Sequence, residues 1–258
     1  MSQPDHPETR RWLDRHGLTD AEPTPLLTTR LAARRQANFF ASVLLATFLI
    51  GAALTHASRL GDGTPAQLRL LVLAALVVAL LAGQWLIGWW VRRVDRQAGA
   101  QLPRRVAHPV TFGWPAVLGR PYAVFTVATF AGALLLTVSV LPISDPDLRA
   151  GAAVVLIGLA GAGAGLVLQL RQVLTAPAVA EDETSLTADV IMRVEDARAL
   201  VAPSLVWILP AIFLYGDSLG WWNAVAIGLV PVGVIALALI HSRTTGVAAA
   251  ARQALAIR

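Results

Sequence analysis

The stretch LLVLAALVVALLAGQWLIGWW, residues 70–90, decides the fold of this chain. It contains no charged residue, and its one amide side chain is Gln84. A helix needs about 20 predominantly apolar residues to cross the hydrocarbon core of a bilayer. We therefore predict that this stretch crosses a membrane as one α-helix, within a span of about 67–91.

Five further stretches have the same apolar character, at about 38–58, 122–142, 149–170, 199–216 and 219–241. The six spans contain no Asp or Glu, and their only Arg residues, Arg69 and Arg149, lie close to the first residue of a span. We predict an all-α, polytopic membrane protein with six transmembrane helices in three hairpins and short amphipathic helices outside the membrane. Residues 38–241 form the membrane domain. The first span starts after 37 residues and is too long for the apolar part of a cleaved signal peptide.

The composition supports membrane residence. The chain is 56% hydrophobic and only 14% charged, whereas soluble domains average about 25% charged residues. The sequence has no cysteine, which excludes disulfides, thiolate nucleophiles and cysteine-based metal sites.

The distribution of arginine predicts the orientation. If the N-terminus is cytoplasmic, the inner segments are 1–37, 92–121, 171–198 and 242–258, and they hold 18 of the 21 Arg residues. Positively charged residues accumulate in the cytoplasmic loops of membrane proteins. We expect both termini to be cytoplasmic and the protein to lie in a bacterial cytoplasmic membrane. The formal net charge of +5 then serves topology, and no nucleic-acid partner is expected.

The N-terminal segment, residues 1–37, predicts two helices. The first runs from Pro7 to His16 and ends at Gly17; the second starts at Thr24, with Pro25 as its first helical residue, and continues into the first span. Arginines gather near the membrane on this second helix, namely Arg30, Arg34 and Arg35. They act as a topological anchor or as a site for anionic lipid. The C-terminal segment, residues 242–258, is predicted to be a basic cytoplasmic tail.

The segment 92–121 predicts an amphipathic helix that continues inward from the second span. Four prolines, at 103, 109, 115 and 121, then exclude a long helix. The segment either packs on the membrane surface or receives a soluble motor subunit. Its candidate partner-docking residues are Arg92, Arg93, Arg96, Arg104 and Arg105.

The segment 171–198 is acidic. We predict a helix from Leu186, capped by Thr184 or Ser185, that either pairs with the arginines of residues 92–105 or docks a basic partner. The acidic candidates for docking are Glu181, Asp182, Glu183, Asp189, Glu195 and Asp196.

Small residues and prolines mark the later spans. Glycines recur on the fourth span and include a GxxxG pair, at Gly151, Gly158, Gly161 and Gly165. Such residues let helices approach closely, against another span or against a second copy of the chain; the sequence leaves both open. Pro203, Pro210 and Pro231 are expected to kink the fifth and sixth spans. The GAGAG run lies in mid-span without a preceding strand, so we expect no nucleotide cofactor.

One catalytic motif is present in form only. Residues 216–220, GDSLG, match the G-x-S-x-G nucleophile elbow, which requires a strand-to-helix turn on an α/β sheet. Here the motif joins two spans, where Gly, Asp and Ser are ordinary turn residues. Hydrolysis at Ser218, with Asp217 and His56, is therefore the least favoured interpretation. We expect no catalytic residue, no metal and no enzyme.

Two interpretations of function remain. Ion-coupled carriers normally need acids within their spans, and none is present. We therefore expect a permease-like subunit of a multiprotein transporter, driven by a separate ATPase and handling apolar or lipid-like cargo. The alternative is a scaffold, sensor or immunity protein that acts through its cytoplasmic loops. Membrane lipids, a cytoplasmic protein partner and a second copy of the chain are the expected partners.

Residues 181–189, EDETSLTAD, followed by residues 193–198, RVEDAR, resemble a segment of uncharacterised actinobacterial integral membrane proteins. Some of those proteins are encoded beside ABC-type ATPases. The resemblance covers about a tenth of the chain. It implies a role with a partner in the membrane and supplies no catalytic residues. Exclusive use of Arg as the strong base, with abundant Ala, Leu, Val and Gly, indicates the same kind of source.

Overall fold

The computed structural model describes residues 6–57, 65–100, 117–177, 180, 182–202, 204–214, 220–244 and 246–256. Helices account for all regular secondary structure in these residues, and no strand occurs among them. The prediction of an all-α fold is confirmed.

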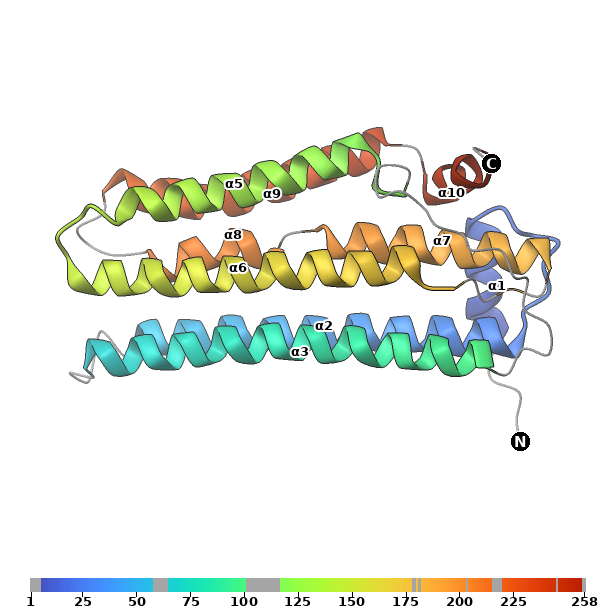
Figure 1. The fold of residues 1–258 in the computed structure, drawn as a ribbon, viewed down its shortest axis with the longest axis horizontal. Coiled ribbons are helices and arrows are strands. Elements are labelled where there is room, and N and C mark those ends of the chain that lie inside the picture. The colour runs from blue at the N-terminus through green and yellow to red at the C-terminus, as the bar shows by residue number, and fades with distance from the viewer. Residues whose placement is uncertain are drawn as a thin grey trace.

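Three layers of helices form the molecule (Figure 1). One layer pairs α2 (Pro25–Ala57) with α3 (Ala66–Ala100), and the opposite layer pairs α5 (Arg120–Val140) with α9 (Trp221–Arg243). Between them lie α6 (Pro146–Thr175), α7 (Glu183–Leu200) and α8 (Ser204–Phe213). At the right-hand end in Figure 1, α1 (His6–Arg15) and α10 (Val247–Ala256) lie beside α7. The helix α7 therefore belongs to the central layer and also to a group of three helices at this end, α1, α7 and α10, which we call the terminal layer.

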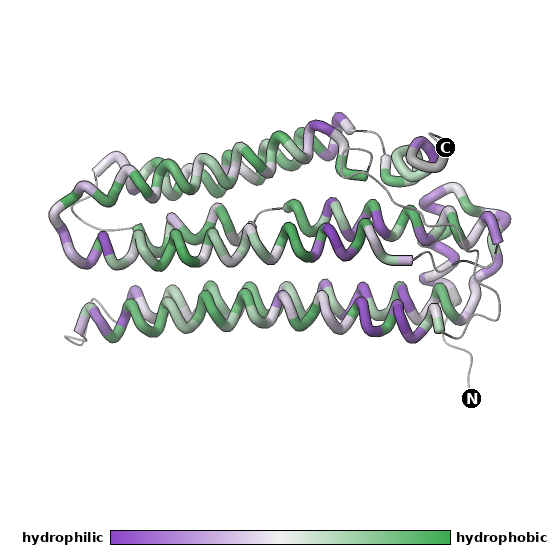
Figure 2. The backbone as a smooth tube through the Cα atoms, viewed as in Figure 1, coloured by the Kyte–Doolittle hydropathy of each residue, from purple (hydrophilic) through white to green (hydrophobic). Residues whose placement is uncertain are grey.

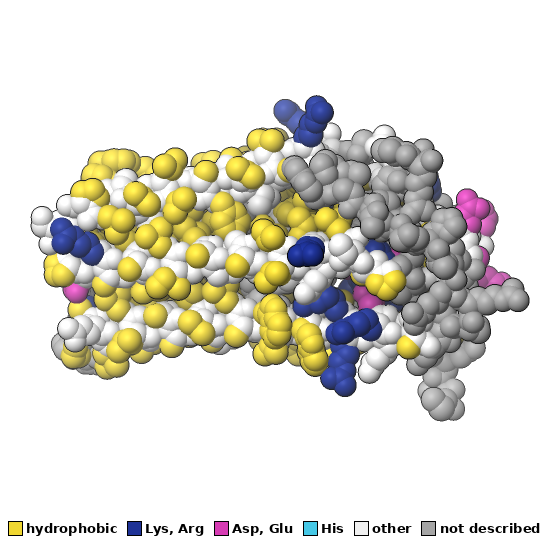
Figure 3. Space-filling model, viewed as in Figure 1, with side chains coloured by type: hydrophobic (Ala, Val, Ile, Leu, Met, Phe, Trp, Pro, Cys, Tyr) yellow, Lys and Arg dark blue, Asp and Glu magenta, His cyan; other side chains and the backbone are white. Residues whose placement is uncertain are grey.

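Five helices are long and apolar enough to cross a membrane: α2, α3, α5, α6 and α9. Figure 2 shows hydrophobic residues along most of their length, with hydrophilic residues concentrated toward the terminal layer. In Figure 3, apolar side chains cover the flank of the bundle away from that layer. Many of them are exposed, such as Ile50 and Ile157, as expected for side chains that face lipid.

The helices α2 and α3 extend beyond the bilayer. They contain 33 and 35 residues, which correspond to about 50 Å at 1.5 Å per residue, against about 30 Å of hydrocarbon. The excess carries Arg30 to Arg35 on α2 and Arg92 to Arg96 on α3. Both helices therefore project toward the terminal layer. For α3 this agrees with the prediction that the helix continues beyond the second span.

The fifth predicted span, 199–216, is not one helix. The helix α7 ends at Leu200, Ala202 is not helical, and α8 has only 10 residues, about 15 Å. Pro203 lies between the two helices in the sequence, outside the described residues, and proline disfavours the helical conformation of the residue before it. Pro210 and Pro231, in contrast, lie inside α8 and α9.

The predicted helix boundaries near the N-terminus agree with the structure. Gly17 has φ 68°, and two hydrogen bonds complete the end of α1: Leu18 N–H donates to Leu13 O, and Gly17 N–H donates to Asp14 O. This pattern is the Schellman motif, which needs a left-handed residue at the glycine. At the start of α2, Thr24 Oγ1 accepts from Leu27 N–H at 3.2 Å.

The acidic helix α7 begins earlier than predicted. Its N-cap is Asp182, whose side chain accepts from Ser185 N–H, while Ser185 Oγ accepts from Asp182 N–H. This reciprocal pair is a capping box, and Ser185 is its second member instead of the cap itself. The helix is also less amphipathic than predicted, since Val190, Ile191, Met192 and Val194 are all buried.

A hydrophobic core joins the terminal layer to the adjoining ends of the long helices. Trp12 and Leu13 of α1, buried residues of α7, and Ala250 and Ala251 of α10 pack together with Leu27 of α2 and Tyr122 of α5. Two further cores lie along the membrane bundle. The segment expected to be a basic tail therefore forms a packed helix, because its alanines fit against α7.

Glycines on α6 mark close contacts within the chain. A Cβ on Gly151 would lie 2.8 Å from the carbonyl oxygen of Phe213 on α8, and one on Gly158 would lie 3.0 Å from Leu209. A Cβ on Gly161 would meet Leu81 of α3, whereas one on Gly165 would meet nothing within 4 Å. The first three glycines therefore pack against neighbouring helices of the same chain.

The contrast along α6 gives a matched test. We expect Gly151→Ala to destabilise the protein by about 1–3 kcal/mol, because the new methyl group meets backbone that cannot move aside. Gly165→Ala is the control and should be neutral or stabilising by up to about 1 kcal/mol, since alanine favours helix. Denaturant unfolding in detergent, followed by tryptophan fluorescence, measures both. Equal destabilisation by the two variants would contradict the packing described here.

Candidate functional site

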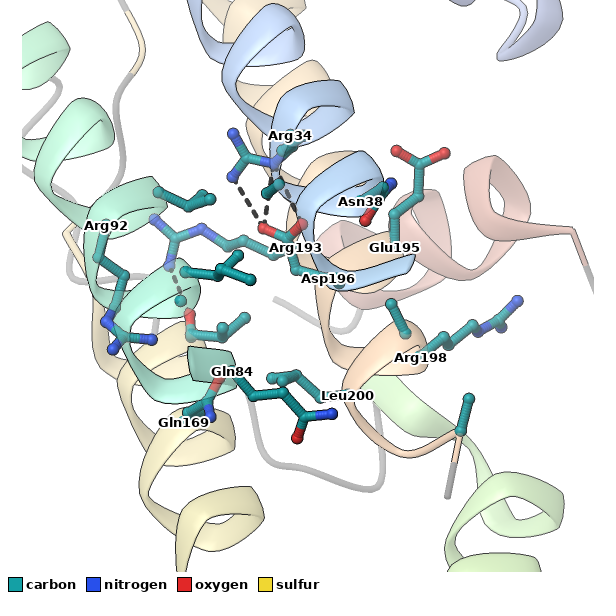
Figure 4. A pocket seen from close by; sticks show the side chains of 18 of the residues that line it. Arg34, Asn38, Gln84, Arg92, Gln169, Arg193, Glu195, Asp196, Arg198 and Leu200 are labelled. Carbon is teal, nitrogen blue, oxygen red and sulfur yellow. Dashed lines mark hydrogen bonds and ion pairs between the residues drawn. The ribbon is translucent and has the colours of Figure 1, made fainter. Parts of the chain in front are cut away.

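A large, partly open cavity of about 2660 Å³ lies between the helical layers and is lined by residues from α1 to α10. Drug-sized ligands occupy pockets of about 300–1,000 Å³, so this cavity has room for a larger molecule. Figure 4 shows part of it, with side chains from α2, α3, α6 and α7 around the space.

The walls of the cavity change character along the bundle. Within the apolar part of the helices the lining includes Leu45, Leu81, Phe130, Ala162 and Val234. Toward the terminal layer the lining becomes polar and mostly cationic, with Arg11, Arg15, Arg30, Arg34, Arg35, Arg92, Arg96, Arg193 and Arg198 alongside Glu8, Asp95, Glu195 and Asp196. The cavity is therefore amphipathic, with an apolar part in the membrane and a charged mouth.

Six charged side chains at the mouth form one buried ion-pair network, namely Arg30, Arg34, Asp95, Asp189, Arg193 and Asp196. Arg30 Nη2 lies 2.6 Å from Asp189 Oδ1, and Arg30 Nε lies 2.8 Å from Asp95 Oδ1. Arg34 Nη2 lies 2.8 Å from both Asp95 Oδ2 and Asp196 Oδ2; Figure 4 shows Arg34 reaching Asp196.

Arg193 completes the network from α7. Its Nε donates to Asp189 Oδ2 at 2.9 Å, and its other nitrogens donate to the carbonyl oxygens of Val173, Ala176 and Pro177. These carbonyls lie at the C-terminal end of α6, where a cation is favourable. Three guanidinium groups thus face three carboxylates where α2, α3 and α7 meet, and Arg193 also binds the end of α6.

Burial makes the network important for stability. Arg30 is 3% exposed and Asp189 is fully buried. Removing one partner of such a pair costs about 3–5 kcal/mol, because the other charge is left without compensation. The network therefore fixes α7 against the extended ends of α2 and α3, at the mouth of the cavity.

A second contact fixes α1 to α7. The carboxylate of Glu195 accepts from Trp12 Nε1 at 3.2 Å and lies 3.1 Å from His16 Nε2. The other ring nitrogen, His16 Nδ1, lies 2.7 Å from the carbonyl oxygen of Trp12. Both ring nitrogens face acceptors, so the imidazole satisfies both only when it carries two protons.

The pKa of His16 follows from this geometry. Burial disfavours the charged imidazolium, but the hydrogen bonds to Glu195 and to the Trp12 carbonyl outweigh burial and raise the pKa above the ordinary 6.5. Arg252 of α10 adds a third tie, since its Nη2 donates to the carbonyl oxygens of His16 and Gly17.

The structure places the predicted docking residues in different environments. Asp189 is buried and Asp196 is partly buried in the network, and Glu195 contacts α1. These three carboxylates therefore pair with residues of the same chain. Asp182, Glu183, Arg93 and Arg96 are exposed, and Arg92 is partly buried. Arg104, Arg105 and Glu181 lie outside the described residues.

The carboxylates of the acidic helix have partners that the sequence did not indicate. The helix was predicted to pair with the arginines of residues 92–105 or to dock a basic partner. Its Asp189 and Asp196 pair with Arg30 and Arg34 of α2 and with Arg193 of α7 itself. Arg30 and Arg34, expected to act as a topological anchor or as a site for anionic lipid, have their guanidinium groups in the network. The length of α2 accounts for these contacts, since it extends past the lipid to reach α7.

The structure does not place the G-x-S-x-G motif, because Asp217 and Ser218 lie outside the described residues. His56 lies within them, and its Nε2 is 2.8 Å from the carbonyl oxygen of Ile212. In the part of the chain that is described, no three side chains of the metal-binding types come together.

The network provides a stability test. We expect Arg30→Gln to destabilise the protein by about 3–5 kcal/mol, because Asp95 and Asp189 lose a buried cation. Arg35→Gln is the control, since Arg35 and its partner Glu8 are 64% and 61% exposed, and exposed pairs contribute less than about 1 kcal/mol. Thermal unfolding in detergent compares the two, and similar losses would contradict the buried network.

The histidine contact predicts a dependence on pH. The folded pKa is raised, so the stabilisation is complete below about 6.5, the unfolded value, and is lost as pH rises through the folded pKa. We expect His16→Gln to speed hydrogen exchange in residues 8–15 at pH 6, and the difference from the wild type to shrink by pH 8.5. A difference that is the same at both pH values would show that His16 acts only by packing.

Three comparisons with known proteins were negative. No protein-family model, curated protein or solved structure matches this chain. The likeness of residues 181–198 to actinobacterial membrane proteins therefore stays a prediction, and the functional argument rests on the geometry of the cavity and its mouth.

Proposed function

We propose that this chain is a non-catalytic, permease-like membrane subunit that holds an apolar or lipid-like cargo and is driven by a separate ATPase. The observation that carries the proposal is the amphipathic cavity, whose apolar walls lie among the membrane helices and whose mouth is charged. Such a cavity matches a molecule with an apolar body and a polar head.

The source of energy follows from the charges. The predicted spans contain no Asp or Glu, so they offer no carboxylate to couple transport to an ion gradient. The carboxylates at the mouth are already paired: Asp95 and Asp196 within the ion-pair network, Glu195 with His16, and Glu8 with Arg35. A cargo subunit of this kind needs a partner to supply energy.

The bias of arginine toward the segments near the terminal layer supports a cytoplasmic location for that layer, with six spans in a bacterial cytoplasmic membrane. In this orientation α8, with the end of α7, completes the fifth span as a broken helix. The exposed charges Glu183, Arg93 and Arg96 then face the cytoplasm. They are the surface to which we assign the ATPase.

The alternative function is a scaffold that does not transport. One observation favours it: α1, α7 and α10 pack in one hydrophobic cluster with the adjoining ends of α2 and α5, which provides a folded platform at one end of the bundle. The two functions differ in whether an energy-supplying partner is bound.

Purification in mild detergent from the native host, followed by native mass spectrometry, tests the proposal. We expect an ATPase to co-purify at fixed stoichiometry, together with bound lipid. The charge reversals Arg93→Glu and Arg96→Glu, combined, should release the ATPase because both residues are exposed. Arg35→Glu, at a position that is also exposed but on α2, is the control and should retain it. A homo-oligomer with lipid and no other protein would contradict the transporter proposal and favour the scaffold.

A further inference from the structure

One wall of the cavity carries polar groups that the ion-pair network does not use. Gln84, Gly88 and Arg92 follow one another at intervals of four residues on α3, which places them on one face of the helix. Gln84 and Arg92 line the cavity, and so does Gln169 of the neighbouring helix α6. In Figure 4, Arg92 and Gln169 lie on the same side of the space.

Gly88 allows these groups to approach. A Cβ at this position would lie 2.7 Å from Gln169 Oε1 and 3.1 Å from Arg92 Nη1. The amide of Gln169 and the guanidinium of Arg92 therefore flank the same point of the α3 backbone. Any larger residue at position 88 would occupy the space between them.

The polar groups of this wall lack partners among the described residues. Arg92, Gln84 and Gln169 are partly buried, yet none of their side chains makes an ion pair or hydrogen bond within that part of the chain. The nearby Arg96 adds a second positive charge, and its Nε donates to the carbonyl oxygen of Arg92. Amide and guanidinium N–H groups that lack a partner and lie beside two positive charges favour the binding of an anion.

The depth of the wall indicates the source of the anion. Arg92 follows Trp89 and Trp90, and tryptophans concentrate at the membrane interface. Toward the middle of the membrane the cavity continues past Gln84 to Leu81, Leu45 and Phe130. An anionic head at Arg92 would therefore have its apolar chains directed along these side chains.

We propose that Arg92, Gln169 and Gln84 form a subsite for the anionic headgroup of a membrane lipid, with the phosphate or carboxylate at Arg92. The subsite rests on the proposed function only in placing an amphiphile in the cavity. The guanidinium supplies the charge, and the two amides donate further hydrogen bonds as the head passes from the interface into the cavity.

Native mass spectrometry of the delipidated full chain tests the subsite. The probes are phosphatidylglycerol, phosphatidylcholine with the same chains, and inorganic phosphate. We expect the wild type to prefer phosphatidylglycerol. Arg92→Gln should weaken this binding about tenfold or more, as for the loss of a charged hydrogen-bond partner. Arg93→Gln is the matched control. It removes the same charge, but from an exposed side chain that lies over the ring of Trp89.

A second variant separates loss of binding from loss of folding. Gln169→Leu keeps the net charge, suits a membrane helix, and should still weaken phosphatidylglycerol binding severalfold. Unchanged binding in Arg92→Gln, an equal loss in Arg93→Gln, or equal wild-type affinity for both lipids would each overturn the subsite. Displacement of the lipid by inorganic phosphate at the same concentration would overturn its assignment to lipid.

The failures of the two proposals are distinguishable. Absence of a co-purifying ATPase would contradict the transporter proposal and would not affect the lipid preference that depends on Arg92. Lipid binding that does not depend on Arg92, in a preparation that retains the ATPase, would contradict the subsite alone.

Discussion

The rest of the structure depends on the burial of three arginines and three aspartates where α2, α3 and α7 meet. Arg30 and Arg34 come from α2, Asp95 from α3, and Asp189, Arg193 and Asp196 from α7. Charges buried in this way are tolerated only when each is paired, so moving these helices apart would leave charges without compensation. Apolar contacts between membrane helices are less selective, because lipid offers an equally apolar alternative.

The network also shapes the cavity. It lies at the mouth, where it fixes the spacing between the α2–α3 hairpin and the central layer of helices. Arg193 simultaneously holds the end of α6 through three carbonyl oxygens, and Glu195 holds α1. The helix α7 is therefore the common partner of the elements around the mouth. A change in α7 would reach the cavity wall through side chains that are already in contact.

Local signals in the sequence predicted much of the fold. The apolar runs predicted the five long helices, Gly17 predicted the end of α1, and Thr24 with Pro25 predicted the start of α2. The sequence could not show that α10 forms a packed helix, because its alanines gain their energy only from contact with α7. It also missed the contact of Trp12 and His16 with Glu195, since 183 residues separate Trp12 from its partner and no local pattern marks either residue.

The sequence by itself determined the apolar helices, because the requirement for about 20 apolar residues acts within each segment. It also determined which segments carry the charges. Only the tertiary structure decided which charges pair with one another and which remain facing the cavity. Those outcomes depend on how far α2 and α3 extend beyond the lipid and on where α7 lies beside them. Arg30 is paired with Asp95 and Asp189 for this reason, whereas Arg92 faces the cavity outside the network, although both follow the same pattern of basic residues beside an apolar run.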